Sequence, residues 1–266
     1  MEMNWSVAPQ AILAMGLVGV FTVCLPLGLG LLFRTRTGGR HRFFLMGCVV
    51  FPLFALGLEG SINRAVLYGP WGGALASNLW LYALYGGLMA GLFEECGRWC
   101  AFRLGRQWSR GPGDALMYGA GHGGIEAVLL AGTAMFNNLA LSIALNRGGL
   151  EAVEAMMGPI PESSLPGLAS LTTTPAGMYL WSGFERLVAV ALHISLSVLV
   201  WRAVERRASL WLFPAAIALH AGVDACAILA AAHIPLAGVE LVALVWAVAL
   251  AVLARWIWRQ REKKSL

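Results

Sequence analysis

The chain has few charged residues. Asp, Glu, Lys and Arg make up 12% of its 266 residues, against about 25% in a typical soluble domain. Apolar residues account for 59%, and the mean hydropathy is +0.71. This composition excludes a soluble globular protein. Repeated apolar runs of about twenty residues predict a polytopic membrane protein folded as a single helical bundle.

The signature motifs of several protein classes are also absent. The five cysteines form no CxxC pair and no cysteine-rich loop. The chain has no HExxH, which excludes an ordinary zincin-type site. It has no GxSxG or serine–lysine constellation and no Walker-type phosphate loop. No arginine-rich aromatic surface is indicated, so nucleic acid is not expected as a partner.

What the chain does contain is a series of apolar runs, which predict an all-α transmembrane bundle. The N-terminal sequence MEMNWSVAPQ lacks a basic stretch and a convincing cleavage site, so we expect no removable signal peptide and an uncleaved first helix. The fourth span can continue to about Asn146. The seven predicted spans are residues 9–33, 43–60, 74–102, 114–136, 176–201, 209–232 and 236–258.

Basic residues gather in alternate connections of this seven-span path. Such residues favour the cytoplasmic side of a membrane, so we predict an N-out, C-in bundle. Tryptophans near span ends are expected to anchor the helices at the membrane surface. The basic residues in these connections are Arg34, Arg36, Arg40, Arg42, Arg103, Arg106, Arg110, Arg202, Arg206, Arg207, Arg255, Arg259, Arg261, Lys263 and Lys264.

We expect residues 1–266 to form one integral membrane domain. Its one long connection, at about 147–175, carries four prolines and a helical stretch, GLEAVEAMM. The alternation of the spans places this connection outside the cytoplasm. It can be a plain connector, or it can be a lid over an active site.

Ionisable side chains interrupt four of the predicted spans at one depth. Such groups are costly in a membrane and usually face the bundle interior or a watery cavity, so they are candidate functional residues. Glu94 and His193 each lie nine residues before an arginine at a span end, which is roughly 13 Å along a helix. His122 and His220 follow such arginines by twelve and thirteen residues, at a similar depth once turn residues are discounted.

The polar residues are also spaced to share helix faces. A histidine and a carboxylate one turn apart can bind tetrahedral zinc, or the carboxylate can fix the histidine tautomer. Two carboxylates near an arginine can hold one proton for acid–base catalysis, or they can form a structural ion pair. Three histidines and four carboxylates at one depth favour a site. The residues four apart are Glu94 with Arg98, His122 with Glu126, His220 with Asp224, and the series Glu185, Ala189 and His193.

With these motifs assembled, the chain resembles the YhfC family of intramembrane metalloproteases. That family belongs to a wider group with CAAX-processing and bacteriocin-processing (Abi/CPBP) proteases, PrsW-like proteases and the Aph-1 subunit of γ-secretase. The resemblance covers about 75–230, which it marks as the catalytic core. The matching segments are FEECGRW (93–99), GAGHGGIEA (119–127), ERLVAVALHISLSVLV (185–200) and LHAGVD (219–224).

The resemblance implies a role for each matching residue. One of the two adjacent glutamates would activate water, with the arginine and a histidine supporting them. A zinc ion would be the cofactor, although the CAAX branch can also be understood without a metal. The chain has EExxR where the CAAX pattern has EExxxR, so no preference for prenylated substrates is transferred. The implied assignments are catalytic for Glu94, Glu95, Arg98 and His122, metal-binding for Glu126, His193, His220 and Asp224, and supporting for Glu185 and Arg186.

The resemblance therefore implies an intramembrane peptidase. Its expected partners are membrane lipid and a peptide or membrane-protein substrate, and its expected location is the bacterial cytoplasmic membrane. Two other functions are open. The polar layer can hold together a non-catalytic scaffold of the Aph-1 type, or it can relay protons in a transporter.

Overall fold

A computed structural model describes residues 5–206 and 209–262 of the chain. Residues 1–4 of the N-terminal sequence and the basic residues Arg207, Lys263 and Lys264 lie outside the described residues. The described part contains helices and no strand, which confirms the all-α fold class.

Within the described residues, six helical stretches are long and apolar enough to cross a membrane, which confirms a polytopic membrane protein. Helix α5 (Leu79–Gly105) corresponds to the predicted span 74–102 and has 27 residues, but its charged side chains lower its hydropathy. The number of spans and the N-out, C-in orientation stay predictions. The six stretches are Pro9–Thr37, His41–Leu67, Pro112–Met157, Ala176–Glu205, Leu212–Ala231 and Leu236–Gln260.

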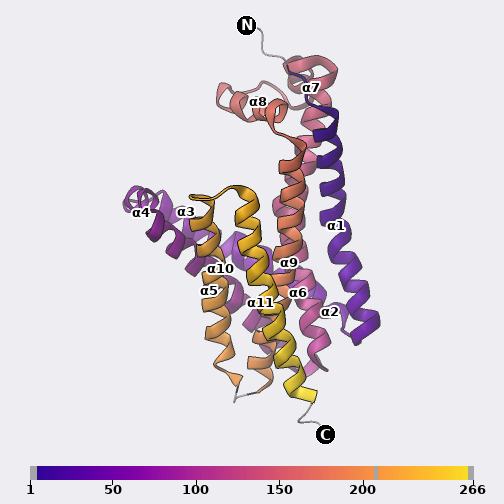
Figure 1. Cartoon of the computed structure of the whole chain (residues 1–266), viewed down its shortest axis with the longest axis vertical. Coiled ribbons are helices and arrows are strands. Elements are labelled where there is room, and N and C mark those ends of the chain that lie inside the picture. The colour runs from indigo at the N-terminus through magenta and orange to yellow at the C-terminus, as the bar shows by residue number, and fades with distance from the viewer. Residues whose placement is uncertain (1–4, 207–208, 263–266) are drawn as a thin grey trace. The chain divides into compact units, whose positions relative to one another are not determined.

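The chain divides into two compact units, and the first comprises residues 5–24 and 127–186. The first turns of α1 pack against α7 around a core that includes Met15 and Leu145 (Figure 1). The side chain of Asn146 accepts a hydrogen bond from the Val7 amide at 2.7 Å and donates one to the Val7 carbonyl at 2.9 Å. The elements of this unit are η3 (Ala127–Gly132), α7 (Thr133–Met157), η4 (Glu162–Ser164), α8 (Leu165–Thr173) and the first parts of α1 (Pro9–Thr37) and α9 (Ala176–Glu205).

The predicted connection at 147–175 is more helical than a plain loop. Helix α7 bends at Gly148 and Gly149, where Gly149 has a φ of 62° that favours glycine. The helix then continues through the predicted helical stretch to Met157, and α8 follows. The backbone at Gly148 and Gly149 is not helical, so α7 consists of two helical pieces. The second piece is the predicted stretch GLEAVEAMM, and all four prolines follow it.

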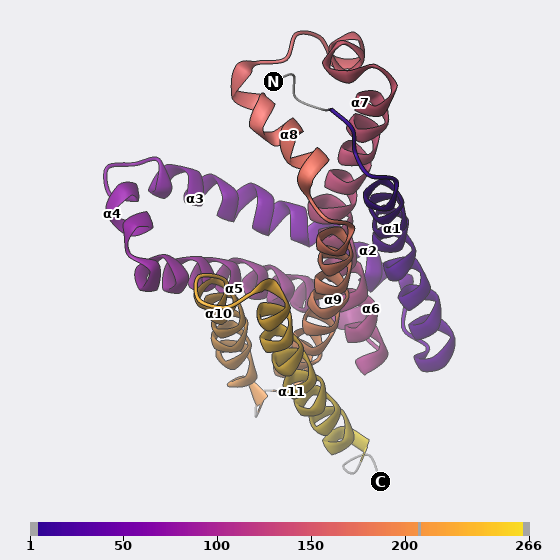
Figure 2. The same cartoon turned by 45° about the horizontal axis from the view of Figure 1, so that its top comes forward.

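The second unit comprises residues 25–126 and 187–262 of the described chain. In it α10 packs against α5 and α11, and α2 packs against α6 (Figure 1). Helices α3 and α5 form a hairpin joined through the short α4 (Figure 2). Its elements are α2 (His41–Phe51), the π-helix η1 (Pro52–Glu59), α3 (Gly60–Leu67), α4 (Gly72–Ser77), α5, η2 (Arg106–Trp108), α6 (Pro112–Glu126), α10 (Leu212–Ala231), α11 (Leu236–Glu262) and the remaining parts of α1 and α9.

Local sequence signals fix where α5 begins and how closely its neighbours approach. The side chain of Asn78 accepts hydrogen bonds from the amides of Trp80 and Leu81, each at 3.1 Å, as an N-cap residue does. Two glycines then permit close helix contacts. A Cβ atom on Gly91 would lie 2.7 Å from the Ile217 carbonyl oxygen of α10. The equivalent atom on Gly119 of α6 would lie 2.4 Å from the Ile194 Cα of α9.

Several predicted cytoplasmic connections meet at one end of this unit. Arg40, in the first connection, forms an ion pair of 2.9 Å with Asp114 at the start of α6. The Asp114 carboxylate also accepts a hydrogen bond from the Arg110 amide at 2.8 Å. The Trp201 indole, near the end of α9, donates to Ser109 at 3.0 Å. The alternation of basic connections predicts this meeting on one side of the membrane.

The contact of Gly119 with α9 predicts a stability effect. We expect Gly119→Ala to lower the free energy of unfolding by about 1–3 kcal/mol, because the added methyl group must push two backbones apart. The measurement is thermal or denaturant-induced unfolding of the purified protein in detergent. The control is Gly28→Ala, because a Cβ atom there would meet nothing within 4 Å. Equal stability of the two variants would rule out close packing of α6 on α9.

Candidate active site

Helix α5 presents two adjacent glutamates and an arginine one turn later. Glu94 is 7% exposed, and Glu95 and Arg98 are fully buried. Successive helical residues point about 100° apart, so the two carboxylates face different neighbours. Buried charges are stable only with partners. Glu95 and Arg98 pair with each other on α5, and the further partners come from α6, α9 and α10.

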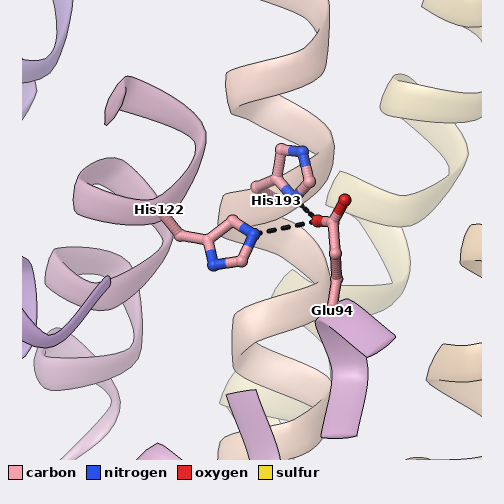
Figure 3. Close-up of side chains that lie close together, drawn as sticks. All are labelled: Glu94, His122 and His193. Atoms are coloured by element: carbon pink, nitrogen blue, oxygen red, sulfur yellow. Dashed lines mark hydrogen bonds and ion pairs between the residues drawn. The ribbon is translucent and has the colours of Figure 1, made fainter. Parts of the chain in front are cut away.

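Glu94 faces two histidines from two other helices (Figure 3). Its Oε2 atom lies 2.9 Å from Nε2 of His122 on α6 and 3.7 Å from Nδ1 of His193 on α9. One ligand atom from each of the three buried residues lies within 4.8 Å of the other two. Two imidazoles and one carboxylate are the protein ligands of a common type of catalytic zinc site. The Glu94–His122–His193 cluster can therefore hold a metal ion.

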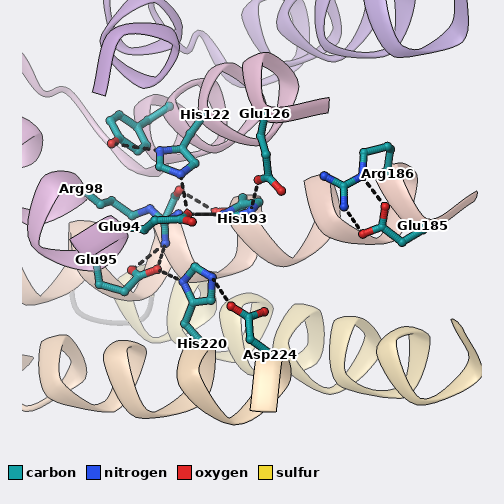
Figure 4. A network of polar contacts seen from close by, with 12 residues as sticks. Glu94, Glu95, Arg98, His122, Glu126, Glu185, Arg186, His193, His220 and Asp224 are labelled. Carbon is teal, nitrogen blue, oxygen red and sulfur yellow. Dashed lines mark hydrogen bonds and ion pairs between the residues drawn. The ribbon is translucent and has the colours of Figure 1, made fainter. Parts of the chain in front are cut away.

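Glu95 belongs to a second set of contacts, the Glu95–His220 chain, which consists of Arg98, Glu95, His220 and Asp224 (Figure 4). The Arg98 guanidinium donates to the two Glu95 carboxylate oxygens at 2.5 and 2.6 Å. Nδ1 of His220 lies 2.8 Å from Glu95 Oε1, and its Nε2 lies 3.6 Å from Asp224 Oδ2. The Asp224 side chain is 35% exposed. The Glu95–His220 chain thus runs from the buried Arg98 guanidinium to the partly exposed Asp224 carboxylate.

Arg98 joins the two sets and determines the tautomer of His193. One Arg98 amine nitrogen lies 3.1 Å from His193 Nδ1. Arginine only donates hydrogen bonds, so Nδ1 is the acceptor and the proton of a neutral His193 lies on Nε2. That Nε2 atom is 2.5 Å from Glu126 Oε2, and a carboxylate in this place orients a metal-binding histidine. The Nδ1 lone pair that Arg98 uses is the one that a metal ion would take.

His122 has a corresponding partner on the far side of its ring. The Tyr118 hydroxyl, fully buried, lies 3.4 Å from His122 Nδ1. A proton on Nδ1 would point at this oxygen and leave Nε2 to face Glu94. The sequence prediction missed Tyr118, although its position four residues before His122 places the two side chains on one helix face.

A further polar group was also missed. The Tyr85 hydroxyl donates to the Asn63 side chain at 2.7 Å, and Asn63 donates to Glu59 at 3.0 Å. The spacing of four between Glu59 and Asn63 is a signal that the sequence does give. These contacts join the α3 side of the hairpin to α5.

The structure brings together the predicted site residues of the second unit, but in a different grouping from the expected one. His193 lies with Glu94 and His122, whereas His220 and Asp224 belong to the Glu95–His220 chain. Glu126 contacts Nε2 of His193, the ring nitrogen other than the one that faces Glu94. The predicted supporting residues Glu185 and Arg186 lie in the first unit and form an ion pair with each other. The roles of all these residues stay predictions.

Comparison with known proteins identifies relatives of the chain. The YhfC intramembrane metalloprotease family matches residues 21–252. The membrane protein YhfC of Bacillus subtilis (strain 168) is 36% identical over 217 residues, which cover 81% of this chain and 83% of the relative. No solved structure matches the chain significantly. The further likeness to CAAX-type and PrsW-like proteases stays a prediction.

The buried pair of Glu95 and Arg98 predicts a compensating set of variants. We expect Arg98→Met to lower the free energy of unfolding by about 3–5 kcal/mol, because it leaves a buried carboxylate without its cation. The double variant Glu95→Gln/Arg98→Met should regain most of that loss. Unfolding in detergent measures both, with Arg103→Met on the same helix as the control. A double variant less stable than Arg98→Met would contradict the pairing.

Proposed function

Because the chain belongs to the YhfC intramembrane metalloprotease family, we propose that it hydrolyses a peptide bond within or at the edge of the membrane. The chain is an integral membrane protein of the kind found in the bacterial cytoplasmic membrane. The buried Glu94–His122–His193 cluster is the single observation that carries the proposal. Burying two imidazoles and a carboxylate between transmembrane helices is costly, and such groups usually mark a functional site.

The first part of the proposal is that these three residues hold a zinc ion. The donor chemistry fits, since the other nitrogens of the two histidines face Tyr118 and Glu126. Arg98 would have to leave Nδ1 of His193 for a metal ion to take that position. Bound zinc would polarise the scissile carbonyl and make a water molecule more nucleophilic. Tyr118 and Glu126 are then positioning residues, which set the ring orientations of His122 and His193.

The second part of the proposal is that the Glu95–His220 chain carries out the proton transfers. When water adds to a carbonyl carbon it loses a proton, and the leaving nitrogen later gains one. Glu95 accepts the Nδ1 proton of His220 at 2.8 Å and thereby leaves Nε2 to take up the water proton and return it to the leaving nitrogen. Asp224, at 3.6 Å from Nε2, stabilises the protonated ring. Arg98 holds Glu95 in the position from which it orients the His220 ring.

A non-catalytic scaffold is the alternative that one observation favours. Each carboxylate of the two sets already has a histidine or arginine partner in the structure. Such a network can stabilise a bundle without reacting. The two functions differ in metal content and in activity, so both are measurable.

The metal proposal predicts a loss confined to the Glu94–His122–His193 cluster. The double variant His122→Ala/His193→Ala should lose the single equivalent of zinc bound by the wild-type protein, because it removes two of three ligands. Elemental analysis and zinc titration of the purified protein in detergent measure this. His233→Ala, outside the site, is the matched control. Zinc retained by the double variant would exclude this ligand set, and metal-free wild-type protein would favour the scaffold.

The proton-transfer proposal predicts a loss of activity with the metal retained. We expect His220→Gln to lower cleavage by about 10²–10⁴-fold, the usual contribution of a general base, and to keep its zinc. Glu94→Gln should lose both. The measurement is quantification of new protein N-termini in bacterial membranes that carry each variant, followed by assay of one cleaved substrate with purified protein. Full activity of His220→Gln would refute its role, and unchanged N-termini with wild-type protein would refute proteolysis.

A further inference from the structure

A cavity in the second unit is lined by none of the residues of the Glu94–His122–His193 cluster or the Glu95–His220 chain. It has a volume of about 440 Å³ and is formed by α6, α9 and α11, and this size is typical of small-molecule sites. Its walls are mainly apolar. The apolar lining residues are Leu116, Ile194, Val198, Ala251 and Ala254.

The residues that α11 contributes to the cavity wall change from alanine to arginine within one helical turn. Ala251, Arg255 and Arg259 follow one another at spacings of four and share one face, and Trp258 lies beside them. Arg255 and Arg259 are exposed, and neither forms an ion pair within the described part of the chain. The cavity therefore combines an apolar interior with two unpaired cations at its edge.

A second, smaller cavity extends the basic edge. It has a volume of about 230 Å³, and its lining includes Arg36, Arg110 and the same Trp258. Its one acidic lining residue, Asp114, already pairs with Arg40 at 2.9 Å. We name Arg36, Arg110, Arg255 and Arg259 the arginine rim. Among the described residues, no other carboxylate lines either cavity.

We infer that these two cavities, which share Trp258 in their linings, bind an anionic phospholipid. An acyl chain occupies the apolar cavity, and the phosphate lies at the arginine rim. Arginine binds phosphate through paired hydrogen bonds, and basic pockets between transmembrane helices are typical sites for anionic headgroups. Trp258 lies where an indole ring meets the headgroup region of a membrane.

The lining also distinguishes a lipid from a peptide. A peptide backbone needs hydrogen-bond partners when it leaves water. The one neutral polar side chain besides tryptophan in the larger cavity is Ser195, and its hydroxyl already donates to the Ala191 carbonyl at 2.8 Å. An acyl chain needs no such partners. The site is independent of the proposed peptidase activity.

The test uses the purified full-length protein and native mass spectrometry with defined lipids. Wild-type protein should retain phosphatidylglycerol in preference to phosphatidylethanolamine. Arg255→Gln/Arg259→Gln should weaken phosphatidylglycerol binding about thirty-fold, because each arginine near a headgroup contributes roughly five-fold. The charge-matched control Arg34→Gln/Arg206→Gln changes two exposed arginines outside both cavities and should bind as wild type does.

A second pair of variants tests the apolar cavity without changing charge. Ala251→Trp fills the cavity and should lower phosphatidylglycerol retention, whereas Val248→Trp, at an exposed position on the same helix, should not. Excess inorganic phosphate should fail to displace the lipid. Equal retention of the two lipids by wild-type protein, displacement by phosphate, or unchanged binding in Ala251→Trp would each overturn the inference. The comparison of lipids on wild-type protein needs no variant to fold.

Discussion

The exclusion of water from the bundle is the constraint on which the site depends. Glu95 and Arg98 are fully buried, and an isolated charge in that environment would be prohibitively costly. The pair satisfies this constraint by direct hydrogen bonds, and Arg98 then has a further amine nitrogen that reaches His193. The same requirement for partners brings His220 to Glu95 and His122 to Glu94. Electrostatic pairing thus orients the side chains of the candidate site and stabilises the helix contacts at once.

Much of this arrangement is visible in the sequence because a membrane restricts the alternatives. Apolar runs identify the helices, and the few polar residues within them have few places to lie. The gathering of Glu94, His122, His193 and His220 follows from their equal depth. Both helical pieces of α7 were visible in the sequence, whereas the direction in which the chain turns at Gly148 and Gly149 was not, because glycine adopts many backbone conformations.

The spacing of the polar residues alone does not predict which of them contact one another. Depth places His193 and His220 in one layer without saying which carboxylate each faces. That choice depends on the rotation of each helix about its axis, which close contacts at Gly91 and Gly119 fix. Tyr118 shows the opposite case. Its spacing from His122 is plain in the sequence, but a tyrosine in an apolar helix carries no sign of function until its hydroxyl is seen beside a ring nitrogen.

The adjacency of Glu94 and Glu95 has a consequence for biogenesis. Because neighbouring residues on a helix diverge, Glu94 pairs with histidines of α6 and α9, whereas Glu95 pairs with Arg98 of its own helix and with His220 of α10. These helices emerge from the ribosome at different times, and no pair of them contains both sets of contacts. A half-inserted chain would therefore be inert. The proposed peptidase would acquire its reactivity only when its last partner helix docks.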